Sequence, residues 1–337
     1  MILRILPIKY GDCIIIEWKD EIESTHIGIL DGGSISSYKE YLRELLMSLS
    51  IPIDFWIISH AHSDHIGGAI KYFNDIMNGY PLPVCKCWIT NFVVQDVILD
   101  NLSSDGTIAT SVSQGNRFIS YLSQQKDIPI INELHTGMQI DFHGLNITIV
   151  TAPRINEYFE IEEDTIATRP CFSDFKSTID DFDLKKFEED SNLTNASSLS
   201  VIVESEGKRF LWLADSLPSV YIPALKYLKN EMNDSLKFDI VSFAHHGSNG
   251  NTNMEYLGMI QSNKFLVTAN AENTQNLPNK ETICRVIMNP KRDIGEHLQF
   301  LFPMENNTLR SMFCVDGNDI MNKLNFSCTY GCTELEI

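Results

Sequence analysis

One stretch of eleven residues restricts what this chain can fold into more than any other. The stretch "ISHAHSDHIGG", residues 58–68, places three histidines and an aspartate within six positions, directly after the apolar run "IDFWII". Such a run is typical of a buried strand, and "GGAIKYFNDIMNG" has the spacing of the following helix. The sequence therefore predicts a polar loop at the end of a buried strand, where layered α/β proteins usually carry ligand-binding loops.

The side chains of this loop are of the types that bind divalent metal ions. His60 and His62 lie two positions apart, so in an extended or turning segment both imidazoles can point the same way. Asp64 and His65 are offset towards a neighbouring position. Neutral imidazole and carboxylate are preferred ligands of zinc and related ions. A lone histidine is more often a packing residue, but four such side chains this close together favour a metal site.

Further candidates follow later strands. "RFLWLADS" places Asp215 at the end of an apolar run, and "VSFAHHGSNG" ends another run in His245 and His246. Upstream, "LRILPIKY", "CIIIEW" and "THIGIL" read as strands, the last of which leads into Asp31 and a glycine pair, and "SLSVIVESEGKRFLWLAD" reads as a hairpin.

These blocks, in this order, resemble the HxHxDH signature and the later elements of the metallo-β-lactamase superfamily. The resemblance runs from residue 11 to about residue 250. It implies an α/β fold, the four-layer αββα sandwich, in which two mixed sheets pack face to face with helices outside and the metal site lies at one edge. We expect the whole chain, residues 1–337, to form one such domain.

The resemblance also implies a ligand set for two divalent ions, Zn²⁺ or Mn²⁺. One ion would be held by His60, His62 and Asp215. The second would be held by Asp64, His65, Asp215 and one of the paired histidines, of which we favour His246. His245 would then contact the substrate or move a proton. Asp31 would support the site by accepting a hydrogen bond from a ligand imidazole.

A narrower resemblance is to the metallo-β-lactamase-like domain of bacterial DNA-uptake (competence) channel proteins. It rests on "YGDCIIIEW", "DGG", "SHAHSDHIGG", "NASSLSVIVESEGKRFLWLADS" and "AHHGSNGNTN". Asn195 and Ser198 match an Asn-x-x-Ser block of that branch, which makes Asn195 a candidate catalytic residue beside Asp64 and His245. The metal-binding histidine that better-known members carry after the strand "LNITIVTAP" is missing, as it is in this branch. Leu277 stands where the branch tends to have another histidine.

Composition limits the partners of the chain. The formal net charge is −19, from 45 acidic and 26 basic residues, which opposes non-specific binding to nucleic acid. The apolar runs are too short to span a bilayer and the N-terminus reads as strands, so we expect no membrane contact and a cytoplasmic location. The eight cysteines are dilute in a chain of this length, and we interpret them as reduced.

Two ions bridged by a carboxylate suit hydrolysis of a phosphodiester best, because such a centre lowers the pKa of water and binds both oxygens of an in-line displacement. We therefore predict a metal-dependent hydrolase, a phosphodiesterase or nuclease, acting on nucleic acid or a small phosphodiester. The alternative is a non-catalytic or weakly catalytic partner subunit of a multi-component system. A homo-oligomer or a protein partner is compatible with the sequence.

One long segment has no counterpart in these motifs. Residues 154–194 are polar, acidic and weakly periodic. A connection of this length is usually functional or flexible. We interpret it as an insertion near the site, either a lid with one short helix or a solvated surface excursion.

Overall fold

The computed structural model describes residues 1–92, 111–125, 127–153 and 173–337. The strands are β1 (Ile2–Ile5), β2 (Ile14–Lys19), β3 (Thr25–Leu30), β4 (Phe55–Ile58), β5 (Trp88–Thr90), β6 (Ile130–Ile131), β7 (Gln139–Phe142), β8 (Leu145–Thr151), β9 (Ser200–Ser205), β10 (Lys208–Trp212), β11 (Ile240–Ser242), β12 (Lys264–Leu266), β13 (Leu298–Phe302), β14 (Phe326–Tyr330) and β15 (Glu334–Glu336). The α-helices are α1 (Ile35–Ser37), α2 (Arg43–Ser48), α3 (Ser63–Met77), α4 (Ser111–Gln124), α6 (Leu193–Ala196), α7 (Pro218–Glu231), α8 (Met254–Leu257), α9 (Lys280–Ile287), α10 (Asn307–Arg310) and α11 (Ile320–Lys323). A π-helical turn (Tyr38–Leu42) joins α1 to α2, and short 3₁₀ turns lie at Ile179–Asp181, Ala244–Gly247 and Cys314–Asp316.

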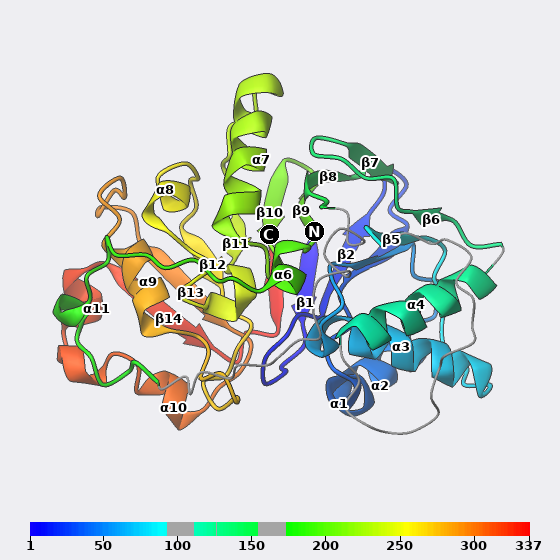
Figure 1. The fold of residues 1–337 in the computed structure, drawn as a ribbon, viewed down its shortest axis with the longest axis horizontal. Helices are drawn as coiled ribbons and strands as arrows, with labels where there is room; N and C mark the ends of the chain where they lie inside the picture. Colours follow the sequence, from blue (N-terminus) through cyan, green and yellow to red (C-terminus); the bar gives the residue numbers. More distant parts are fainter. Residues whose placement is uncertain (93–110, 126, 154–172) are drawn as a thin grey trace.

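Within the described residues the strands form two mixed sheets. A seven-stranded sheet has the order β15-β1-β2-β3-β4-β5-β6, and an eight-stranded sheet has the order β14-β13-β12-β11-β10-β9-β8-β7. In the first sheet, β3 to β6 run parallel and β15, β1, β2 and β3 pair antiparallel. The second sheet repeats this plan, with β10 to β14 parallel and β7 to β10 antiparallel. The two termini lie side by side because β15 pairs with β1 (Figure 1).

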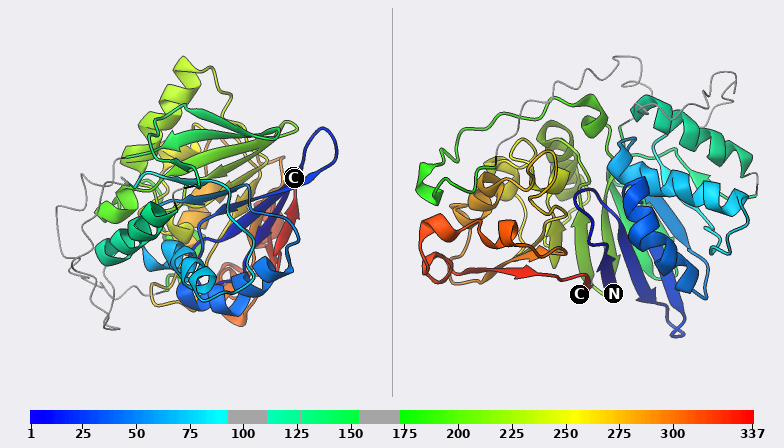
Figure 2. Two further views of the ribbon diagram at one scale, coloured as in Figure 1. Left: turned by 90° about the vertical axis from the view of Figure 1, so that its right-hand side faces the viewer. Right: turned by 90° about the horizontal axis from the view of Figure 1, so that it is seen from below.

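The sheets pack face to face, and each has helices on its outer face (Figure 2). The strand β4 shows why its sequence "FWII" is apolar throughout. Phe55 and Ile57 point into the core between the sheets, whereas Trp56 and Ile58 pack beneath the helices around α3. Both faces of β4 are therefore covered, as is usual for parallel strands in layered folds. Together with the equivalent packing of α7 and α9 on the second sheet, this confirms the four-layer αββα sandwich predicted from the sequence.

The predicted insertion, residues 154–194, ends in the first turn of α6, and the residues before that helix divide into two parts. Residues 154–172 lie outside the described residues. Residues 173–192, here called the strap, pack on the outer helical layer beside α9. Asp174 accepts hydrogen bonds from the backbone N–H groups of Lys280 (2.8 Å) and Glu281 (2.9 Å) at the start of α9, and Phe175 and Ile179 are buried in the same core as that helix. Phe175 and Ile179 thus attach the strap to the core, whereas its other residues are exposed or half-buried.

Two glycine pairs hold the loop after β3 against the start of α3. A Cβ atom on Gly68 would lie 1.9 Å from the backbone oxygen of Gly32, so only glycine allows this approach. Two backbone hydrogen bonds cross the contact, from Gly32 N to His65 O (2.7 Å) and from Gly68 N to Gly33 O (2.9 Å). The motifs "DGG" and "HIGG" are thus one structural unit that fixes the first turn of α3.

The helix α3 begins four residues before the point that its apolar pattern suggested. His62 is extended, with φ −66° and ψ 145°, and its carbonyl accepts hydrogen bonds from the N–H groups of His65 and Ile66. Asp64 and His65 consequently lie on the first turn of the helix, where a carboxylate is favoured by the helix dipole. In the described part of the chain, no helix combines the length and apolar character needed to cross a membrane. The seven cysteines found there are free thiols.

Candidate metal centre

The predicted ligands converge where β4, β10 and β11 end. His60 and His62 lie in the turn between β4 and α3, Asp64 and His65 open α3, Asp215 follows β10, and His246 follows β11. His60 and His65 are 0% exposed, and Asp215 and His246 are 1% exposed. Residues far apart in the sequence thus form one buried cluster.

The two oxygens of Asp215 face different groups of side chains. Oδ2 lies 3.6 Å from His60 Nε2 and 3.8 Å from His245 Nε2, whereas Oδ1 lies 3.4 Å from both His65 Nε2 and His246 Nε2. One compact group of possible metal-binding atoms comprises His60, His62 and Asp215. The carboxylate of Asp215 therefore lies between two positions, as expected for a bridging ligand.

The second group comprises Asp64, His65 and His246, whose possible metal-binding atoms also lie within 4.8 Å of one another. Asp64 Oδ2 is 3.7 Å from His65 Nε2 and 3.5 Å from His246 Nε2, and the two imidazole nitrogens are 3.3 Å apart. Around a tetrahedral ion with bonds of about 2.0–2.1 Å, neighbouring ligand atoms lie about 3.4 Å apart. The spacing in this group is close to that value.

An unusual backbone turns both paired histidines towards Asp215. In an extended strand, neighbouring side chains point to opposite faces. Here His245 and His246 both have left-handed backbone angles, with φ +48° and +55°. Such angles are strained for residues other than glycine, at a cost of order 1–3 kcal/mol each. A hydrogen bond from His245 N to Ala214 O (2.8 Å) holds the turn.

Partners of Nδ1 fix the orientation of the buried imidazoles. His65 Nδ1 donates to Asp31 Oδ2 (2.6 Å), which is the support predicted for Asp31. Ser59 donates its hydroxyl proton to the same oxygen (2.6 Å), so its Oγ accepts from His60 Nδ1 (2.9 Å). His246 Nδ1 lies 3.0 Å from Thr268 Oγ1.

With the Nδ1 proton used in this way, each imidazole presents the lone pair of Nε2 to the centre. In the neutral imidazoles these lone pairs face one another and the carboxylates of Asp64 and Asp215. Asp215 Oδ1, moreover, is buried without a hydrogen-bond partner. Acceptors gathered this closely in a buried site are stabilised by a metal ion or by protons between them. The donor set therefore fits divalent metal ions.

The pKa shifts in the cluster have the same origin. Burial alone would lower the pKa of His65, but Asp215, Asp64 and Asp31 raise it well above its ordinary value. Burial opposes charge on His246 too, yet Asp215, together with Asp12 and Asp64, raises its pKa to about 10. For Asp215, burial is outweighed by the imidazoles of His65 and His246, which hold its pKa well below the usual range. Protons and metal ions consequently compete for the same lone pairs.

On the other side of the cluster, burial and the nearby His65 lower the pKa of His60 well below its ordinary value, and burial also lowers that of His62. Both imidazoles are therefore neutral at physiological pH, which is the form that binds metal.

Two supporting carboxylates were missed as site residues in the sequence. Asp12 accepts a hydrogen bond from Trp212 Nε1 (2.7 Å), and its other oxygen lies 3.5 Å from His246 Nδ1. Asp190, in the strap, lies 3.3 Å from His245 Nδ1. The block "YGDC" could have pointed to Asp12, because it stands at a loop between two strands. Asp190 gave no signal among the many acidic residues around it.

Asn195, predicted as a catalytic residue, lies behind His245. Its side chain donates to Asp190 Oδ2 (2.7 Å) and lies 3.4 Å from His245 Nδ1. Asn195 is only 1% exposed. Its contacts place it where it can orient other groups of the site.

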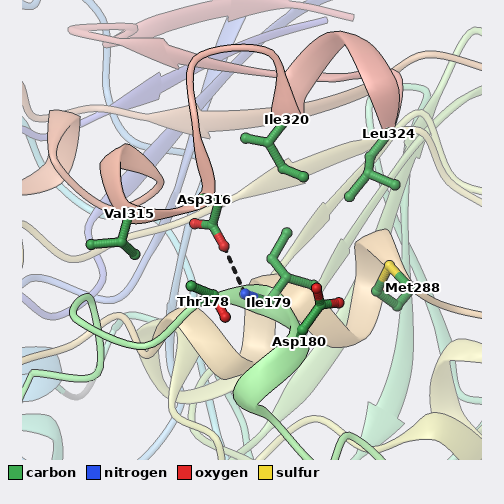
Figure 3. A pocket seen from close by; sticks show the side chains of 8 residues that line it. All are labelled: Thr178, Ile179, Asp180, Met288, Val315, Asp316, Ile320 and Leu324. Carbon is green, nitrogen blue, oxygen red and sulfur yellow. Dashed lines mark hydrogen bonds between the residues drawn. The ribbon is translucent and has the colours of Figure 1, made fainter.

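Two other features lie apart from this cluster. His26, Asp54 and His143 also gather possible ligand atoms, but Asp54 is already paired with Lys86 (2.8 Å), and the rings of His26 and His143 stack on each other. The pocket in Figure 3 lies between the strap, the end of α9 and the C-terminal segment; its walls are formed by Thr178, Ile179, Asp180, Met288, Val315, Asp316, Ile320 and Leu324. It contains none of the predicted site residues.

A scan against protein-family models found no match, and a search of curated proteins found none either. Among solved structures, the chain is similar to Zn²⁺-bound PqqB from Methylobacterium extorquens, with 11% identity, a TM-score of 0.46 and coverage of 100% of both chains. It is similar to the metallo-β-lactamase fold protein YhfI from Bacillus subtilis, with 11% identity, a TM-score of 0.42 and coverage of 83% of this chain and 91% of the other. A diphosphatase of the PhnP family has 10% identity and a TM-score of 0.38, with coverage of 81% and 76%.

At these values the similarities say nothing about activity. The four-layer architecture and the convergence of the ligand-type residues rest on the chain's own sheets and contacts.

Proposed function

We propose that this chain is a metal-dependent phosphodiesterase or nuclease of the metallo-β-lactamase superfamily, close to its competence-type branch, with two divalent ions, Zn²⁺ or Mn²⁺. The observation that carries the proposal is the position of Asp215 between two groups of imidazole nitrogens. A single-ion site would not need a carboxylate whose two oxygens face opposite ways.

We propose the same division of the residues between the two positions that the sequence suggested. His60, His62 and Asp215 would hold one ion, and Asp64, His65, Asp215 and His246 the other. When bound, the ions lower the pKa of water and neutralise charge on the attacking and leaving oxygens of an in-line displacement. Asp31 and Ser59 contact Nδ1 of His65 and of His60, so that Nε2 of each imidazole is directed at the other ligands of the centre.

Asp64 differs from the other carboxylate of the set. Its side chain is 14% exposed, whereas that of Asp215 is 1% exposed. Asp64 and His245, whose side chain is 16% exposed, are therefore more open to solvent than Asp215. The carboxylate oxygen of Asp64 that does not face His65 and His246 would accept a proton beside the substrate, while Asp215 stays enclosed.

Charge limits the substrate. The net charge of −19 opposes long contacts with duplex nucleic acid, so we propose a small phosphodiester or a single strand. A cytoplasmic location and an oligomeric or protein partner stay predictions.

Hydrolysis can be tested with purified protein supplied with Mn²⁺ or Zn²⁺. The substrates are bis(p-nitrophenyl) phosphate and labelled single- and double-stranded nucleic acids. Asp64→Ala and His246→Ala should abolish cleavage, and His297→Ala is the matched control, because His297 is exposed and hydrogen-bonds to Asn325 and Ser327 outside the cluster. Cleavage that needs no metal, or that survives both substitutions, would refute the proposal. Metal binding without cleavage of any phosphodiester would favour the partner-subunit alternative.

A further inference from the structure

The first ion position has an additional imidazole at its edge. His60 Nε2 and His245 Nε2 lie 3.6 Å and 3.8 Å from the same oxygen, Asp215 Oδ2. His245 is the fourth histidine, after His60, His65 and His246, whose Nε2 approaches this carboxylate. From the sequence we expected His245 to contact the substrate or to move a proton. Its hydrogen-bond partners in the structure indicate another role.

The hydrogen bonds of Asn251 define the protonation of His245. Asn251 Nδ2 donates to the backbone oxygens of Asp215 (3.1 Å) and Ser216 (3.4 Å), which leaves Asn251 Oδ1 as the atom facing His245 Nδ1 (3.2 Å). Asp190 Oδ2 lies 3.3 Å from the same nitrogen. Asn195 Nδ2 lies 3.4 Å from this nitrogen too, but it donates to Asp190 Oδ2 at the shorter distance of 2.7 Å. The two acceptors at Nδ1 therefore place the proton on this nitrogen.

In its neutral form, which is the form that binds metal, His245 has the lone pair of Nε2 directed at Asp215 Oδ2. In a buried site this lone pair and the carboxylate oxygen repel each other unless a metal ion or a proton lies between them. The same arrangement is present at His60 and His65, whose Nδ1 atoms are held by Ser59 and Asp31. Imidazoles that bind metal almost always donate their other N–H to a carboxylate, a carbonyl or water. His245 thus has the environment of a ligand.

Asp190 is itself held firmly in this position. It accepts hydrogen bonds from Asn195 Nδ2 (2.7 Å) and from the backbone N–H of Asn192 (2.9 Å), and its own N–H donates to Gly250 O (3.1 Å). A Cβ atom on Gly250 would lie 2.9 Å from Asp190 N, so the loop after the paired histidines needs glycine to admit the strap. The strap therefore contributes one carboxylate to the site, that of Asp190, and holds it in a fixed position.

We infer that Asp190 is a positioning residue that directs His245 Nε2 to the first ion position, where His245 acts as a ligand together with His60, His62 and Asp215. This inference rests on the two-ion site of the proposed function, but not on the reaction it catalyses. It gives the strap a role that neither a lid nor a surface excursion describes.

The test is Zn²⁺ stoichiometry and affinity, measured by metal analysis after dialysis and by competition with a chromophoric chelator. We expect His245→Gln and Asp190→Asn each to retain one tightly bound Zn²⁺ and to bind the other at least ten-fold more weakly. His60→Gln should give the same pattern, and the His60→Gln/His245→Gln double variant should weaken binding at that position further while the other Zn²⁺ stays tightly bound. Asp180→Asn is the matched control, since Asp180 is an exposed carboxylate on the same strap.

The melting temperature of each variant shows whether it has folded. If Asp190→Asn does not fold, the metal content of His245→Gln still tests the inference. Two Zn²⁺ ions bound with wild-type affinity in His245→Gln would overturn the inference, and a loss of activity alone in that variant would return His245 to the role of moving a proton. If the wild type binds two ions but cleaves no phosphodiester, the proposed reaction is wrong. In that case, loss of only one ion in His245→Gln and Asp190→Asn still supports this inference.

Discussion

The substitution Gly68→Ala tests how closely the fold and the metal centre are linked. The new Cβ atom would lie 1.9 Å from Gly32 O, which is backbone and cannot rotate away. A normal contact would require the start of α3 and the loop after β3 to separate by about 1.5 Å. That movement would break the two backbone hydrogen bonds that cross the contact and displace His65, whose carbonyl accepts one of them.

The cost can be worked out from its parts. Overpacking costs about 1–3 kcal/mol, each lost hydrogen bond adds about 1 kcal/mol, and replacing a helical glycine with alanine returns up to about 1 kcal/mol. We therefore expect a net loss of about 2–4 kcal/mol in the free energy of unfolding, or a fall of about 3–6 °C in melting temperature. Metal affinity should fall as well, because His65 moves away from His246.

Chemical denaturation and metal analysis check both expectations. Gly295→Ala is the control, because its added Cβ would meet only the side chain of Asp293 at 3.2 Å in an exposed loop. It should change the free energy of unfolding by less than about 0.5 kcal/mol. If Gly68→Ala unfolds like the wild type and retains its metal, the close approach of the two glycine pairs does not position the site.

The other predictions concern the support of the site and the strap. Asp31→Asn should reduce metal affinity by about ten- to a hundred-fold, measured by chelator competition, because His65 loses its anionic partner. Metal affinity should rise with pH, because the pKa values of His65 and His246 are raised and metal must displace their protons. Calorimetry in buffers of different ionisation enthalpy measures this proton release. A metal affinity that does not depend on pH would contradict the expectation. Asp316→Ala should lower the free energy of unfolding by about 3–5 kcal/mol, measured by urea denaturation, because it leaves the fully buried ammonium of Lys280 without its carboxylate partner. A loss below about 1 kcal/mol would contradict this role of the ion pair.

The sequence predicted those parts of the fold whose signals are local. The apolar run "FWII" indicated a strand covered on both faces, and the structure buries Trp56 and Phe55 on opposite sides of β4. The spacing of His60 and His62 and the position of Asp215 after a strand likewise identified the residues that the fold brings together. Each of these depends on one strand and the turn that follows it.

Other features depend on contacts that no local pattern contains. The orientation of His245 and His246 requires two successive residues in left-handed conformations, which are disfavoured for side chains with a Cβ and are held here by the backbone of Ala214. Asp190 reaches His245 only because the strap packs on α9 and on Gly250, and nothing distinguishes it from other acidic residues of its segment. The early start of α3 was missed because His62 begins the helix without a side-chain cap.

The central claim is that Asp215 joins two metal positions, and the metal content of the purified protein tests it most directly. Protein dialysed against excess Zn²⁺ or Mn²⁺ and then desalted should contain two ions per chain, and Asp215→Ala should lose both. A wild-type content that stays at one ion or below, or an Asp215→Ala variant that still binds two, would contradict the account.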